Sequence, residues 1–182
     1  MTSPPEASAS QPGQAPASPK AVAFVGFSNS GKTELICRLL PGFAARGLRV
    51  AVLKHSHHQD LDREDQGKDT WRYRRAGAHT VALAAPGLLQ VSYSFPGEPP
   101  LTQVLTTLAP EVDLILVEGY KTGPLPKVAV LGTETGKEVE VPNFPHLIAL
   151  VSGRPVDSPL PVFQPHQLEE LGNWLYDYLT RD

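Results

Sequence analysis

The stretch GFSNSGKT, residues 26–33, decides how this 182-residue sequence is interpreted. It fits the pattern G-x-x-x-x-G-K-[ST], in which backbone N–H groups and a lysine surround a chain of phosphates. The apolar run AVAFV precedes it, which is typical of a strand covered on both faces, and a helical pattern of apolar residues follows. Because the residues and both flanks agree, the stretch predicts a phosphate-binding loop between a strand and a helix.

Each residue type in this loop suits a particular task. The two glycines permit tight backbone turns, so that successive N–H groups can point at a phosphate. We expect Lys32 to reach the β- and γ-phosphates of a nucleotide and the Thr33 hydroxyl to bind Mg²⁺. The residues predicted to contact the nucleotide are Gly26, Ser28, Asn29, Ser30, Gly31, Lys32, Thr33 and Glu34.

A phosphate loop of this kind works with a second acid near the metal, at the end of a neighbouring strand. The stretch DLILVEG, residues 113–119, provides one, since apolar residues lead to Glu118 and Gly119 allows the chain to turn away. We therefore predict Glu118 and Thr33 as the Mg²⁺ ligands. A strand-end carboxylate without a metal stays open as the alternative, and Asp113 is interpreted as a surface or capping acid.

The rest of the pattern predicts an α/β fold. Residues 35–43 carry apolar side chains at helical spacing, with Pro41 kinking or ending the helix and Cys37 as a small buried residue. Residues 49–54 predict a second buried strand. Further strands are expected at 80–84, 88–95, 127–131, 138–141 and 147–152, and helices at 69–76, 101–108 and 168–179. Strand–helix–strand order implies parallel pairing, hence a P-loop NTPase-like three-layer sandwich with a mostly parallel central sheet.

Composition bounds the domain organisation. Residues 1–19 hold five of the 19 prolines and few apolar side chains, so we predict a disordered tail followed by one domain over residues 20–182. A single cysteine excludes an internal disulfide framework. No apolar run reaches membrane-spanning length and the N-terminus lacks a secretory signal pattern, so we expect a cytoplasmic protein without a membrane partner. The net charge of −3 argues against a nucleic-acid partner.

Charge is concentrated just after the second predicted strand. Residues 54–75 hold 11 of the 35 charged side chains and three of the six histidines, at the sheet edge where the phosphate loop lies. Three interpretations stay open: contacts to phosphate or Mg²⁺, a transition-metal site built from histidines, and a solvated loop followed by a short helix that Asp69 caps. The candidate substrate or partner contacts are Lys54, His55, His57, His58, Asp60, Asp62, Asp69 and Arg74.

Taken together and in order, the motifs GFSNSGKT, KHSHHQDLD, GKDTWRYRRAGA and DLILVEGYK resemble the MobB family of molybdopterin-guanine dinucleotide biosynthesis adapter proteins. The resemblance covers roughly residues 21–152. It implies GTP and Mg²⁺ as cofactors, weak hydrolysis at most, a homodimer, and a MobA-like guanylyltransferase as partner. It also implies that Gly31, Lys32 and Thr33 occupy the phosphate and magnesium positions and that Glu118 is the strand-end acid.

Two other functions stay open at this point. One is a small-molecule P-loop kinase that holds its acceptor with the basic helix near Arg72, and the other is a histidine-rich metallochaperone GTPase. Guanine selectivity follows from the resemblance alone. The sequence contains no [NT]-K-x-D motif, and Gly153 stands where relatives often carry aspartate.

Overall fold

The computed structural model describes residues 20–56, 66–132 and 140–181. The predicted tail, residues 1–19, and four predicted contacts, His57, His58, Asp60 and Asp62, lie outside the described residues. Of the described helices, none has the length and apolar character needed to cross a bilayer.

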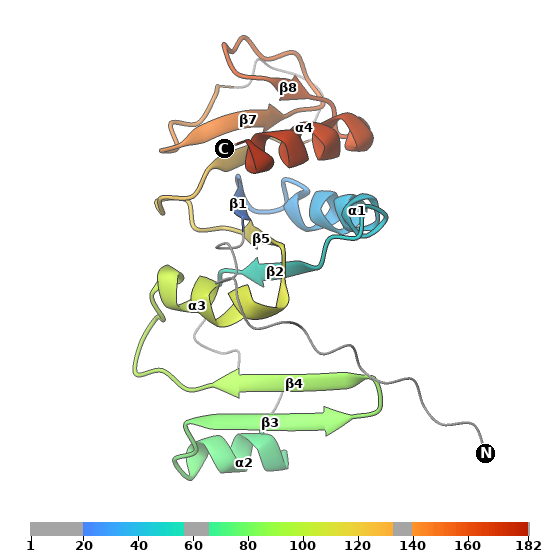
Figure 1. Cartoon of the computed structure of the whole chain (residues 1–182). Helices are drawn as coiled ribbons and strands as arrows, with labels where there is room; N and C mark the ends of the chain where they lie inside the picture. The colour runs from blue at the N-terminus through green and yellow to red at the C-terminus, as the bar shows by residue number, and fades with distance from the viewer. Residues whose placement is uncertain (1–19, 57–65, 133–139, 182) are drawn as a thin grey trace, which may run out of the picture.

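The described chain forms a six-stranded parallel sheet and a separate antiparallel hairpin (Figure 1). The parallel sheet has the strand order β2-β5-β1-β6-β7-β8. Its strands are β1 (Lys20–Val25), β2 (Val50–Lys54), β5 (Leu114–Glu118), β6 (Lys127–Val130), β7 (Leu147–Val151) and β8 (Val162–Phe163). The hairpin consists of β3 (Thr80–Ala85) and β4 (Leu88–Tyr93). The helices are α1 (Lys32–Ala44), α2 (Asp69–Arg75), α3 (Leu101–Leu108) and α4 (Leu168–Thr180), with a 3-10 turn, η1 (Ala109–Glu111), after α3.

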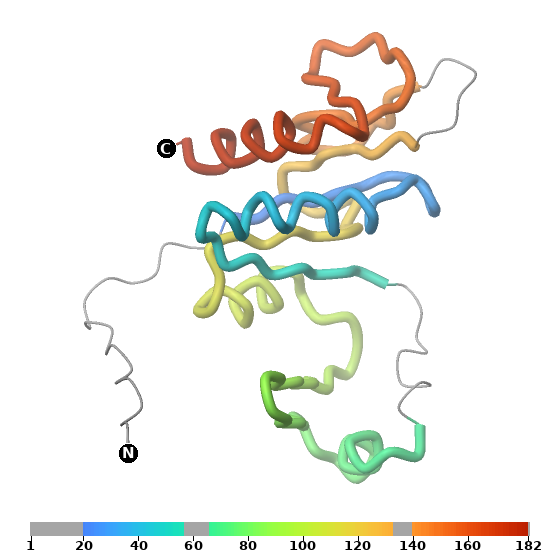
Figure 2. Tube along the Cα trace, turned by 90° about the vertical axis from the view of Figure 1, so that its right-hand side faces the viewer, coloured from blue at the N-terminus to red at the C-terminus, as the bar shows by residue number. Residues whose placement is uncertain are grey.

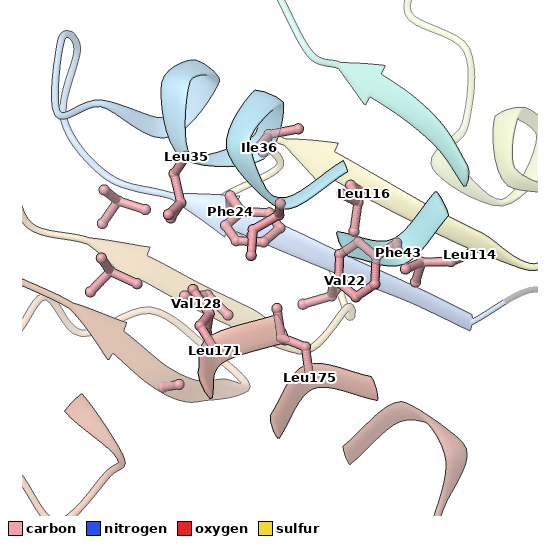
Figure 3. Close-up of a cluster of buried hydrophobic side chains, with 14 of the residues drawn as sticks. Val22, Phe24, Leu35, Ile36, Phe43, Leu114, Leu116, Val128, Leu171 and Leu175 are labelled. Atoms are coloured by element: carbon pink, nitrogen blue, oxygen red, sulfur yellow. The ribbon is translucent and has the colours of Figure 1, made fainter. Parts of the chain in front are cut away.

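Helices cover both faces of the parallel sheet, which creates two hydrophobic cores. On one face, Val22 and Phe24 of β1 pack with residues of α1 and α4, including Phe43 and Leu175 (Figure 3). On the other face, Ala23 and Val25 lie in a second core that α3 borders. Alternate residues of β1 therefore point into different cores, which explains its continuous apolar run. The predicted three-layer α/β architecture is confirmed.

The predicted strand at 49–54 forms as β2, but the expectation that it is buried is wrong. It lies at the edge of the sheet and pairs only with β5 among the described strands. One side of an edge strand has no neighbouring strand to cover it, and the side chain of Val52 is 47% exposed. The apolar sequence of β2 therefore predicted more burial than the strand has.

Two other local predictions need correction. Pro41 does not end α1, since the Ala45 N–H donates to the Pro41 carbonyl at 2.9 Å and the helix continues to Ala44. The strand expected at 138–141 does not form at Glu140 or Val141, and residues 138 and 139 lie outside the described part. The short β8 was not predicted, because two residues are too few to show a period.

Asp113 has the capping role expected of it. Its carboxylate accepts hydrogen bonds from the Arg49 guanidinium at 2.8 Å and from the Arg49 backbone N–H at 2.8 Å. These bonds lower the pKa of the Asp113 carboxyl to about 2. The pair ties the start of β5 to the start of β2, at the sheet edge opposite the phosphate loop.

Leu175 tests whether α4 is an integral part of the fold. It is fully buried in the core shared by α1 and α4, so Leu175→Ala is expected to lower the free energy of unfolding by about 2–5 kcal/mol. Asn173→Ala, on the exposed face of the same helix, should change it by less than about 0.5 kcal/mol. Urea denaturation measures both, and equal losses would contradict the assigned packing.

Candidate functional site

The carboxyl ends of β1, β2 and β5 meet at one edge of the parallel sheet, where a pocket of about 1080 Å³ opens. Open α/β sheets bind ligands at this edge. Segments far apart in the sequence line the pocket: the loop after β1 with the start of α1, residues 54–56 at the end of β2, Glu98, and residues 118–122 at the end of β5. Of the predicted nucleotide contacts, those that line the pocket are Gly26, Ser28, Asn29, Gly31, Lys32, Thr33 and Glu34.

Backbone conformation explains why the loop needs its glycines. Gly26 has φ +152°, and a side chain there would collide with the carbonyl oxygen of Val130 on the neighbouring strand. Gly31 has φ +90° and occupies the N-cap of α1, and Asn29 has φ +59°. These left-handed residues turn the chain from β1 into α1, which directs the first turn of the helix at the pocket.

Lys32 lies folded across the loop. Its ammonium donates to the Phe27 carbonyl at 2.5 Å and to the Ser30 hydroxyl at 3.3 Å. Partial burial lowers the pKa of Lys32; Glu118 opposes this shift, whereas the Lys121 and Lys54 ammoniums add to it. Ser30 does not line the pocket, so the structure places it as a support for Lys32.

Thr33 and Glu118 come together although 85 residues separate them. The Thr33 hydroxyl donates to Glu118 Oε2 at 2.8 Å, and the Lys54 ammonium lies 3.3 Å from Glu118 Oε1. A hydroxyl and a carboxylate are oxygen ligands of the kind that Mg²⁺ prefers. The two residues predicted as metal ligands therefore lie together and have the chemistry that suits Mg²⁺, and their role as ligands stays a prediction.

His55 forms a second cluster beside Glu118. Its Nε2 lies 2.8 Å from Glu98 Oε1, and its ring stacks on Tyr120 with the centroids 4.1 Å apart. Its backbone N–H donates to the Glu118 carbonyl at 2.9 Å. Sequence reasoning missed Glu98 and Tyr120. Glu98 follows the hairpin in a loop without a motif, whereas Tyr120 could have been found from its place directly after the strand-end Glu118 and Gly119.

Several predicted residues lie elsewhere or differ from expectation. Asp69 and Arg74 belong to α2, which packs beside β3 and contributes nothing to the pocket lining (Figure 2). Asp69 is the first residue of α2 and makes no side-chain cap, because Lys68 occupies the N-cap; its carboxylate lies 3.6 Å from Arg72. Cys37 is exposed and lines the pocket, because it lies off the buried face of α1. The basic helix of the kinase alternative thus stands apart from the phosphate loop.

Of the three histidines in the predicted cluster, His55 lies within the described residues. Within the described segments, no three His, Cys, Asp or Glu side chains gather in a way that could hold a metal ion. His57 and His58 lie outside those segments, so the histidine-based metal site stays a prediction.

A parallel α/β sandwich with a glycine-rich phosphate loop after its first strand defines the P-loop NTPase-like class of proteins. Residues 21–153 match the family described as Molybdopterin guanine dinucleotide synthesis protein B, MobB. The chain belongs to the MobB family.

Named relatives and solved structures agree with this assignment. The molybdopterin-guanine dinucleotide biosynthesis adapter protein of Haemophilus influenzae is 32% identical, over 85% of this chain and 89% of the relative. The Escherichia coli adapter protein is 30% identical, over 88% and 93%. A crystal structure of Bacillus subtilis MobB superposes with a TM-score of 0.67 at 29% identity, covering 90% of this chain and 99% of that one.

Gly119 provides a test of the packing at the site. It has φ +104°, and an added Cβ would lie 3.0 Å from the Cβ of His55. Gly119→Ala is therefore expected to lower the free energy of unfolding by about 2–4 kcal/mol, from backbone strain plus crowding. Gly47 has φ +75° and open space around it, so Gly47→Ala introduces backbone strain without crowding. It should lower the free energy of unfolding by about 1–2 kcal/mol. Equal losses in urea denaturation would refute the close contact with His55.

Proposed function

We propose that this chain is a GTP-binding adapter of molybdopterin-guanine dinucleotide biosynthesis. The observation that carries the proposal is the Thr33–Glu118 contact of 2.8 Å at a phosphate loop, in a chain of the MobB family. The relatives from Haemophilus influenzae and Escherichia coli carry the adapter name. Guanine preference and a MobA-like guanylyltransferase as the partner belong to the proposal through this family membership, as does a cytoplasmic location.

In this proposal different residues of the pocket bind different parts of the nucleotide and its metal ion. Lys32 leaves its contacts with the Phe27 and Ser30 oxygens to bind the β- and γ-phosphates. Thr33 and Glu118 would hold Mg²⁺, which when bound neutralises phosphate charge. Lys54 and Lys121 also line the pocket and add positive charge near the last phosphate.

Slow turnover is part of the same proposal. Hydrolysis needs a group that orients and deprotonates water. Glu118 is engaged by Thr33 and Lys54, and Glu98 is engaged by His55. With Glu118 assigned to Mg²⁺ and Glu98 in contact with His55, neither acid is assigned to the attacking water, which favours slow hydrolysis.

Replacing the phosphate-loop lysine tests nucleotide binding. Lys32→Ala is expected to weaken Mg²⁺–GTP binding by about tenfold or more, because charge-assisted hydrogen bonds to phosphate contribute about 1.5–3 kcal/mol. Lys68→Ala, outside the pocket lining, serves as the matched control and should leave affinity unchanged. Isothermal titration calorimetry with GTP and with ATP gives the affinities and the base preference. Failure of the unaltered protein to bind either nucleotide would refute the proposal.

We also propose that the hairpin is the homodimer surface. Among the described strands, β3 and β4 pair only with each other, and a two-stranded ribbon is marginally stable alone. Val81 is buried on one face of the hairpin, whereas Leu89, Val91 and Tyr93 share the opposite face and are 65%, 40% and 48% exposed. Figure 1 shows the hairpin separate from the parallel sheet, and the exposed fractions show that this face is accessible. A second copy, related by a two-fold axis, would cover it with the same side chains.

A charge on the exposed hairpin face should separate the two copies. Leu89→Asp is expected to shift the protein from dimer to monomer at micromolar concentration, because a carboxylate would be buried without a partner. Tyr176→Asp, on an exposed part of α4, is the control and should leave the mass unchanged. Light scattering coupled to gel filtration measures the mass. A monomeric unaltered protein, or a Leu89→Asp variant that stays dimeric, would exclude this interface.

A further inference from the structure

Lys127, the first residue of β6, is fully buried, which is rare for a lysine. Its ammonium donates hydrogen bonds to the carbonyl oxygens of Gly123 and Leu125, the latter at 2.9 Å. Both carbonyls belong to the β5–β6 loop, residues 119–126. This burial also lowers the pKa of Lys127.

Packing alone does not explain a lysine at this position. Ala129, two residues along the strand, points to the same face and lies in the apolar core that α3 borders. An apolar side chain of similar length could fill the space of Lys127 without desolvating a charge. An apolar side chain could not donate hydrogen bonds to the two loop carbonyls that face inward. The Lys127 ammonium donates to both at once.

The β5–β6 loop forms one wall of the nucleotide pocket. Tyr120, Lys121 and Thr122 all line the pocket. At its start the loop is held by the stacking of Tyr120 on His55, and Tyr120 adopts a left-handed φ of +53°. At its end the loop is held by Lys127. The residues that face the phosphate loop therefore lie between two anchors.

We propose that Lys127 is a positioning residue for the nucleotide site: it holds the β5–β6 loop so that Lys121 and Thr122 face the phosphates. This inference rests on the proposed function, because it assumes that the pocket holds a nucleotide. It assigns Lys127 no contact with the ligand, since the side chain lies beneath the loop and does not line the pocket.

Lys127→Met removes the donors and keeps the length of the side chain. Amides of residues 119–126 are expected to exchange hydrogen about tenfold faster, and Mg²⁺–GTP affinity to fall about five- to tenfold, because two inward carbonyls lose their partners. Lys20→Met, an exposed lysine of β1, is the matched control and should change neither quantity. Hydrogen exchange with mass spectrometry and calorimetry provide the two measurements.

A double-mutant cycle separates positioning from packing. If Lys127 acts through Lys121, then Lys121→Ala combined with Lys127→Met should weaken GTP binding no more than the stronger single change. Additive losses would overturn the action through Lys121. Faster loop exchange with unchanged GTP affinity would overturn the positioning role and leave a structural anchor.

A shorter donor provides a second variant. Lys127→Gln retains one amide that can donate to a loop carbonyl. The hydrogen-exchange rate of the loop and the GTP affinity should therefore be intermediate between those of the unaltered protein and of Lys127→Met. It also serves if Lys127→Met does not fold. If the unaltered protein does not bind GTP, the proposed function is refuted. In that case the exchange measurement alone decides whether Lys127 holds the loop, and unchanged exchange would overturn the inference completely.

Discussion

The parallel register of β5 between β1 and β2 is the constraint on which the site depends. This register aligns Glu118 with Phe24 on one side and with Lys54 on the other. The acid at the end of β5 consequently lies beside the first turn of α1, where the Thr33 hydroxyl reaches it at 2.8 Å. A shift of one residue would point the Glu118 side chain to the other face of the sheet. The two apolar cores prevent that shift, because every residue of β5 before Glu118 is buried.

The polar side chains that line the pocket contact one another. Lys54 pairs with Glu118, and His55 pairs with Glu98. Lys32 satisfies its donors with oxygens of its own loop. The Glu118 carboxylate and the loop oxygens offset the repulsion between the Lys54 and Lys32 ammoniums. These contacts hold the side chains of the pocket in defined positions.

Much of the parallel sheet could be predicted from the sequence, because β1, β5 and β7 are continuous apolar runs of the kind that a sheet covered on both faces requires. The hairpin was harder to interpret. Its strands were predicted, but their separation from the main sheet was not, since the spacing of Val81 and Leu83 shows alternation without showing a partner. Cys37 and Val52 were expected to be buried and are exposed, because the apolar pattern of an element does not reveal where its neighbours end.

The sequence by itself determined the phosphate loop and the acid at the end of DLILVEG, since these depend on short-range backbone chemistry: glycines at left-handed positions and an apolar strand that ends in a carboxylate. Only the tertiary structure placed Glu98 on His55, stacked Tyr120 on the same ring, and buried Lys127 beneath the β5–β6 loop. These contacts join residues from separate elements. Their geometry follows from the order and register of the strands, which no local pattern contains.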